Sequence, residues 1–184
     1  PRGPEGVNSS ENRGAPAAAG ILPPLLPGQR PVAATIDDLA GEGHSHIGVD
    51  GCGSPAHVIS LVGLARAFRA IATGSGGDAG DQVYAAMTTR PEMVGGDCRD
   101  VTHFMLHVPG LMAKDGADGV FAAAMPDGRC VALKIADGAN RARPPVMVAA
   151  LRALGIDVST VEPLVMQWVL GNGRHVGEVR AIAP

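Results

Sequence analysis

Residues 109–138 read Pro-Gly-Leu-Met-Ala-Lys-Asp-Gly-Ala-Asp-Gly-Val-Phe-Ala-Ala-Ala-Met-Pro-Asp-Gly-Arg-Cys-Val-Ala-Leu-Lys-Ile-Ala-Asp-Gly, and this stretch decides the fold. Three short apolar runs predict strands at 111–114, 120–125 and 130–136. In the last of these, apolar residues occupy alternate positions, as expected of a strand with one buried face. Residues 126–129, Pro-Asp-Gly-Arg, form a predicted hairpin turn, because an Asp-Gly pair accepts the positive φ that a tight turn demands. The stretch therefore predicts a small sheet of neighbouring strands.

Lys114-Asp115-Gly116 closes the first of these strands. A lysine at a strand end, followed by a turn of small residues, can point its ammonium group into a cleft beside the sheet. There it would stabilise a substrate carboxylate or a developing oxyanion, or lower the pKa of a serine. The alternative is a lysine that ends a strand at the protein surface. We take Lys114 as the candidate catalytic residue and Asp115 and Gly116 as candidate substrate-binding residues.

Composition limits the class of protein. The chain has 184 residues, enough for one domain, with 46% hydrophobic residues but only 3% aromatic ones, so small side chains must build the core. A net charge of −3 predicts no nucleic-acid partner, and the absence of a long apolar run predicts no membrane span. Three cysteines are few and odd in number, which favours reduced thiols and a cytoplasmic location.

The chain divides into two parts of different composition. Residues 1–30 hold six of the 15 prolines and are rich in Gly and Ala, which predicts a disordered or irregular lead-in before a domain at 31–184. Helical spacing and capping residues predict helices at 32–39, 60–72, 80–89, 100–108 and 144–154.

Further strands frame these helices. Residues 47–50 predict a brief strand, and a Gly-Asn-Gly turn at 171–173 precedes a last predicted strand at 175–182, while 164–170 stays undecided. Helices followed by a strand hairpin and a closing helix predict an α+β fold, with helices packed on a mainly antiparallel sheet.

A second candidate site follows the strand at 47–50. Asp50, Gly51, Cys52 and Gly53 are candidate substrate-binding residues, because two glycines around a cysteine let backbone N–H groups approach a ligand. The alternative is a tight turn with a buried, inert cysteine. Arg99 is a candidate for holding a carboxylate through two parallel hydrogen bonds, and the alternative is a surface salt bridge.

Lys134 is the only other lysine in the chain. It alternates with Leu133 and Ile135 on the third predicted strand, so we expect it to face away from them and to be solvated. Asp137-Gly138, which follows, reads as turn chemistry rather than as part of a site.

Five separated blocks resemble, in order and spacing, the thermolabile-type L-asparaginase II family. They are Gly-Val-Asp-Gly-Cys-Gly-Ser-Pro at 48–55, Leu-Ala-Arg-Ala-Phe at 64–68, Arg-Pro-Glu-Met-Val-Gly-Gly at 90–96, the Lys114 segment, and Ala-Leu-Lys-Ile-Ala-Asp-Gly at 132–138. The resemblance covers about 31–182. It implies a β-lactamase/transpeptidase-like fold, similar to that of glutaminases, in which Lys114 corresponds to the lysine of the Lys-Thr-Gly element.

The resemblance also implies an activity. Members hydrolyse L-asparagine to L-aspartate and ammonia with a serine that a lysine activates, so the expected partner is a small-molecule amide, and a homo-oligomer is left open. The family's Ser-x-x-Lys and Cys-Ser-Gly-Lys-His motifs are missing, because none of the seven serines has a lysine three residues later. A serine without such a base is a poor nucleophile.

We therefore expect the chain to correspond to the C-terminal part of the family, with an incomplete fold and no activity by itself. Two alternatives stay open. One is a different serine amidohydrolase of the same fold, acting on glutamine or a peptide-like amide. The other is a non-catalytic remnant that binds or oligomerises.

No cofactor is expected. Some members of the family hold zinc with two cysteines and a lysine around the loop at 50–54, so a zinc site here would use Cys52 and Cys98, with His44, His46 and His57 as further ligands. Pro55 stands where that lysine would lie, and Val101 occupies the place of the second cysteine. These differences favour a protein without a metal.

Overall fold

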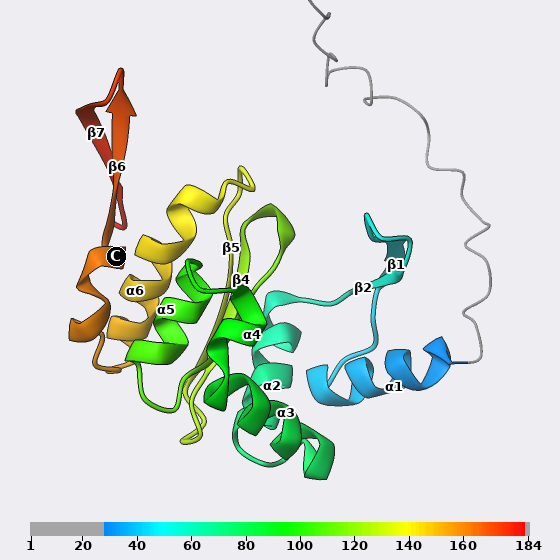
Figure 1. The fold of residues 1–184 in the computed structure, drawn as a ribbon. Coiled ribbons are helices and arrows are strands. Elements are labelled where there is room, and N and C mark those ends of the chain that lie inside the picture. The colour runs from blue at the N-terminus through cyan, green and yellow to red at the C-terminus, as the bar shows by residue number, and fades with distance from the viewer. Residues whose placement is uncertain (1–27, 183–184) are drawn as a thin grey trace, which may run out of the picture.

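A computed structural model describes residues 28–182, which form a mixed α+β fold with small antiparallel sheets (Figure 1). The predicted lead-in at 1–30 falls outside the described residues up to Pro27. The α-helices are α1 (Gln29–Ala40), α2 (Leu61–Ala72), α3 (Gly77–Thr89), α4 (Pro91–Gly95), α5 (Asp100–His107) and α6 (Arg143–Ala153). The 3₁₀ turns are η1 (Ala117–Gly119), η2 (Asn140–Ala142) and η3 (Ser159–Leu164). Among these described helices, none has the length and apolarity that a membrane crossing requires.

The strands are grouped into three antiparallel sheets. They are β1 (His46–Val49), β2 (Pro55–Val58), β3 (Met112–Asp115), β4 (Val120–Ala124), β5 (Cys130–Lys134), β6 (Met166–Gly171) and β7 (Arg174–Arg180). The central sheet has the order β3-β4-β5, whereas β1-β2 and β6-β7 are two-stranded ribbons. The antiparallel pairing was predicted, but the strands do not join into one sheet. Both ribbons expose much of their surface, so neither is packed into a common core.

Local sequence accounts for the central sheet. The turn between β4 and β5 is closed by the backbone N–H of Met125, which donates to the carbonyl of Arg129 at 2.8 Å. Gly128 adopts φ of 91°, a conformation that a residue with a side chain rarely takes, so the predicted Asp-Gly turn is confirmed. The three strands predicted in this stretch are confirmed to within one or two residues.

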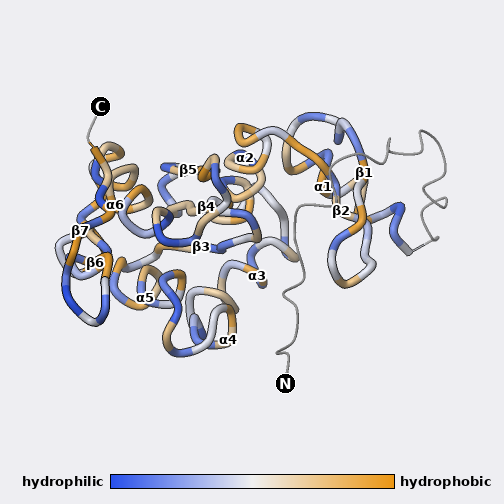
Figure 2. Tube along the Cα trace, turned by 90° about the horizontal axis from the view of Figure 1, so that it is seen from above, coloured by the Kyte–Doolittle hydropathy of each residue, from blue (hydrophilic) through white to orange (hydrophobic). Residues whose placement is uncertain are grey.

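Helices cover both faces of the central sheet, as Figure 2 shows from above. On one face Phe121 of β4 meets Phe104 of α5 edge to face, with ring centroids 5.6 Å apart, and Met147 and Leu151 of α6 complete this core. On the other face Met112 and Ala124 of the sheet pack against α2, in the cluster that contains Ala72. Alanine-rich strands allow this close packing from two sides.

The helix predictions are confirmed with shifted ends. Ser60 caps α2, and its hydroxyl accepts a hydrogen bond from the N–H of Gly63 at 2.9 Å. Helix α3 begins at Gly77, three residues before the predicted start at 80, and Gly77 itself has a positive φ of 71°, which the absence of a side chain allows. The pattern analysis did not predict β2 and α4, which are four and five residues long.

Candidate active site

A buried carboxylate lies at the end of β3. Asp115 pairs with Phe121 across the sheet, so its side chain points to the face that carries the larger core. Its side chain is only 2% exposed. A charge in such a position requires partners, since desolvation of an unpaired carboxylate is costly.

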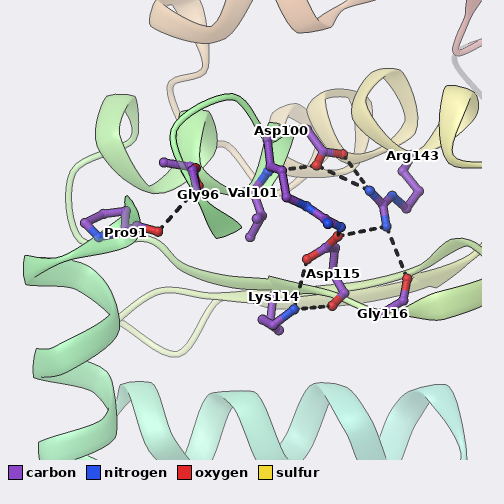
Figure 3. A network of polar contacts seen from close by, with 10 residues as sticks. Pro91, Gly96, Asp100, Val101, Lys114, Asp115, Gly116 and Arg143 are labelled. Atoms are coloured by element: carbon purple, nitrogen blue, oxygen red, sulfur yellow. Dashed lines mark hydrogen bonds and ion pairs between the residues drawn. The ribbon is translucent and has the colours of Figure 1, made fainter. Parts of the chain in front are cut away.

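Three cations from three parts of the chain supply those partners (Figure 3). Lys114 Nζ lies 3.0 Å from Asp115 Oδ1, Arg143 Nη1 lies 3.1 Å from Oδ2, and Arg99 Nη2 also donates to Oδ2. Lys114 belongs to β3, Arg99 directly precedes α5, and Arg143 is the first residue of α6. The carboxylate therefore ties the sheet to both helices that cover this face.

Arg143 is the buried support of the network. Its side chain is 4% exposed, its Nη2 lies 3.2 Å from Asp100 Oδ2, and its Nη1 donates to the carbonyl of Gly116 at 3.2 Å. The guanidinium carbon lies 5.7 Å from the ring centroid of Phe121, within the range of a cation–π contact. Through these contacts Arg143 holds Asp115 and Gly116, at the end of β3, in place.

The network carries excess positive charge at its exposed side. It contains three cations and two carboxylates, which leaves one net positive charge. Its solvent-facing members are both cations, since the side chains of Lys114 and Arg99 are 47% and 54% exposed. Burial alone would raise the pKa of Asp115, but hydrogen bonds from Lys114 and Arg99 outweigh this effect and hold that pKa below its ordinary value. Asp115 thus stays ionised while it orients both cations.

The geometry suits recognition of an anion. Lys114 Nζ and Arg99 Nη2 bind different oxygens of one carboxylate, so the two cations lie close together without touching the same point. Each keeps further N–H donors, because an ammonium has three and a guanidinium five. Two such groups on a fixed support can hold a carboxylate and stabilise a developing oxyanion.

The family comparison decides the relationship. The family model described as L-asparaginase II matches residues 12–181. The chain belongs to the L-asparaginase II family. A search of the curated proteins found no match.

The structure brings together four of the residues that we associated with asparaginase II chemistry, namely Lys114, Asp115, Gly116 and Arg99. The other four, Asp50 to Gly53, lie in the loop between β1 and β2, and Figure 2 shows this ribbon apart from β3. That loop is a tight turn, with the N–H of Gly53 donating to the carbonyl of Asp50 at 2.8 Å. Cys52 is exposed in it, so the alternative of a buried cysteine does not hold.

Sequence patterns did not predict two residues of the site. Asp100 lies at the start of the helix predicted at 100–108, and Arg143 lies directly before the helix predicted at 144–154. A charged residue directly before two prolines at a helix start is the only signal of Arg143 in the sequence. Nothing in a local pattern reveals that this arginine is buried against Asp115, which lies 28 residues earlier.

The residues present do not fit the zinc site known from some asparaginase II proteins. Within residues 28–182, no group of three or more His, Cys, Asp or Glu side chains is placed to hold a metal ion. Cys52 and Cys98 are both exposed free thiols in different loops. His44 instead binds Asp37, with Nδ1 2.8 Å from Oδ1. No chemical step is therefore assigned to zinc.

Proposed function

We propose that this chain supplies the charge-binding part of an asparaginase II site, for hydrolysis of L-asparagine to L-aspartate and ammonia. Family membership supports the reaction class, and the observation that carries the proposal is the pair of exposed cations held by buried Asp115. The substrate has an α-carboxylate at one end and an amide at the other. Arg99 takes the carboxylate, and Lys114 stabilises the oxyanion that forms when the amide carbon is attacked.

Asp115 and Arg143 act through these two groups. Asp115 fixes the positions of Lys114 Nζ and Arg99 by accepting hydrogen bonds on its two oxygens, and Arg143 holds Asp115 in place through an ion pair. Overall, the amide C–N bond breaks, a C–O bond forms with oxygen from water, and ammonia leaves. The nucleophilic step is assigned to no residue of this chain, because the 184 residues hold no serine with a lysine base in helical register.

We further propose that the fold has a β-lactamase-like arrangement. A central antiparallel sheet with helices on both faces supports a β-lactamase-like arrangement, in which Lys114 lies at the end of an edge strand. The missing nucleophile favours a second candidate, a non-catalytic protein that only binds an amino-acid ligand through the same two cations.

Ammonia release tests the proposal. Purified residues 1–184 should release negligible ammonia from L-asparagine. A chimaera is then made by placing the part of a complete family member that carries both serine motifs in front of residue 31. In this chimaera Lys114→Ala should lower kcat/KM at least about 100-fold, which corresponds to about 3 kcal/mol of transition-state stabilisation. Lys134→Ala, the matched control, should change it less than about threefold.

The outcomes separate the candidates. Hydrolysis of L-asparagine by residues 1–184 alone would contradict the inference that this chain contains no nucleophile. Equal effects of the two lysine variants in an active chimaera would show that Lys114 is not the charge-stabilising residue. A chimaera that folds and binds L-asparagine but releases no ammonia would favour the non-catalytic candidate, and faster hydrolysis of L-glutamine would reassign the substrate.

A further inference from the structure

A polar cleft of about 480 Å³ opens between α5, α6 and β6. Its volume falls within the range of small-molecule sites. Arginine, amide and imidazole side chains from four parts of the chain line most of it. The lining residues on which the site depends are Arg99, Arg141, Arg143, His103, Asn140 and Gln167.

The arginines of the cleft differ in how firmly they are held. Arg143 is buried and committed to Asp100 and Asp115. Arg141 is 59% exposed. Its one ion partner among the described residues is Asp137, whose Oδ2 lies 2.6 Å from Arg141 Nη2 and whose side chain is 52% exposed. An exposed ion pair of this kind contributes little to stability, so Arg141 is available to a competing anion. Arg99 likewise keeps donors that Asp115 does not use.

Three further polar side chains in the cleft are unassigned. The amides of Asn140 and Gln167 and the imidazole of His103 make no hydrogen bond with another described residue. The first turn of α5 borders the cleft, but its Val101 N–H already donates to Asp100 Oδ1 at 2.9 Å, so the helix end is not counted among the free donors. Side-chain N–H donors and the positive charges of Arg99 and Arg141 remain on one hollow, which is the chemistry of a site for carboxylates.

We propose that this cleft binds a small dicarboxylate. Arg99 and Arg141 line the cleft from two different segments, before α5 and in η2, and each guanidinium can pair with one carboxylate through two parallel hydrogen bonds. The space exceeds what one oxyanion needs, and the amides of Asn140 and Gln167 complete the lining for the carbon backbone and remaining oxygens. Arg99 is shared with the proposed substrate site, but Arg141, Asn140 and Gln167 have no part in that site.

Titration of the full chain with succinate tests the proposal. Binding is followed by calorimetry and by amide NMR shifts, with sodium chloride keeping the ionic strength constant. Succinate should bind, shifting amide signals of residues around the cleft, and Arg141→Gln should weaken its affinity at least about tenfold. Arg152→Gln is the matched control. Arg152 is an exposed arginine near the C-terminal end of α6 that pairs with Glu162, so its replacement should change the affinity for succinate less than about twofold.

Three results would overturn the proposal. These are the absence of succinate-dependent shifts at the cleft, equal effects of the two arginine variants, and binding of inorganic phosphate as tight as that of succinate, which would indicate a site for one oxyanion. Failure of the proposed function is a separate event, since an inactive chimaera with intact, Arg141-dependent succinate binding would contradict only the hydrolysis.

Discussion

The two lysines of the chain lie on the two outer strands of the central sheet, and only one of them binds a buried carboxylate. Lys114 pairs with Ala122 and Lys134 with Val120, so both side chains lie on the α2 face. Lys114 Nζ binds the carbonyl of Asp115 at 2.7 Å and its buried carboxylate at 3.0 Å. Lys134 Nζ binds only carbonyl oxygens, those of Asp118 and Ile135, at 2.5 and 2.8 Å.

The surroundings of the two lysines explain why only one of them belongs to the charged network. Lys134 faces away from Leu133 and is exposed, as predicted, and its ammonium also donates to two backbone carbonyls. The difference between the two lysines comes from the aspartate that follows each of them along the chain. Asp115 points to the core beside Arg143, whereas Asp137 lies exposed in a turn, where it accepts the N–H of Ala139 at 2.9 Å. A lysine becomes part of a charged network only where the fold buries its neighbour.

The largest effect is expected from breaking the buried side of this comparison. Asp115→Asn removes the charge that three cations share, and the loss should lower the free energy of unfolding by about 3 to 5 kcal/mol. Asp137→Asn should leave it close to the wild-type value, because Asp137 and its partner Arg141 are both exposed. Urea unfolding followed by far-ultraviolet circular dichroism measures both, and similar values for the two variants would contradict the assigned burial.

Acid should weaken the same network. The pKa of Asp115 lies below the value of about 3.9 expected for an unfolded chain, so its contribution to stability is fully present above that pH. It is lost as the pH falls through the lowered pKa of the folded state. The gap in unfolding free energy between the wild type and Asp115→Asn should therefore be largest near about pH 7 and shrink towards about pH 3. Taking the difference cancels other acidic groups, and a gap that stays constant would argue against an ionised Asp115.

The smallest losses of stability are expected from replacing the two lysines themselves. Lys114→Met should cost about 1.5 to 3 kcal/mol of stability, because it removes a hydrogen bond to a buried charge. Lys134→Met should cost less than about 1 kcal/mol, since water can reach the two carbonyls that it leaves free. Thermal and urea unfolding of both variants, with the wild type as reference, would show this order. A reversed order would mean that the carbonyl contacts of Lys134 matter more than the ion pair.

Local sequence patterns were sufficient for the central hairpin and most helices. The Asp-Gly turn at 127–128, the alternation in β5 and the apolar stripe of α2 each depend on residues a few positions apart. Arg99 could be proposed to bind a carboxylate, but its observed partner is Asp115, 16 residues away. The burial of Arg143 and the distance of the 50–54 loop from Lys114 are set by how α6 and the β1–β2 ribbon pack. No short-range pattern contains that information.

The β6–β7 ribbon has a consequence for spectroscopy. The one tryptophan of the chain, Trp168, lies exposed on this ribbon and stacks on His175, with ring centroids 4.2 Å apart. A two-stranded ribbon is only marginally stable and can open before the rest of the protein unfolds. Tryptophan emission from this protein is therefore a local signal that reports the opening of two strands, and its melting midpoint need not match that of the helices.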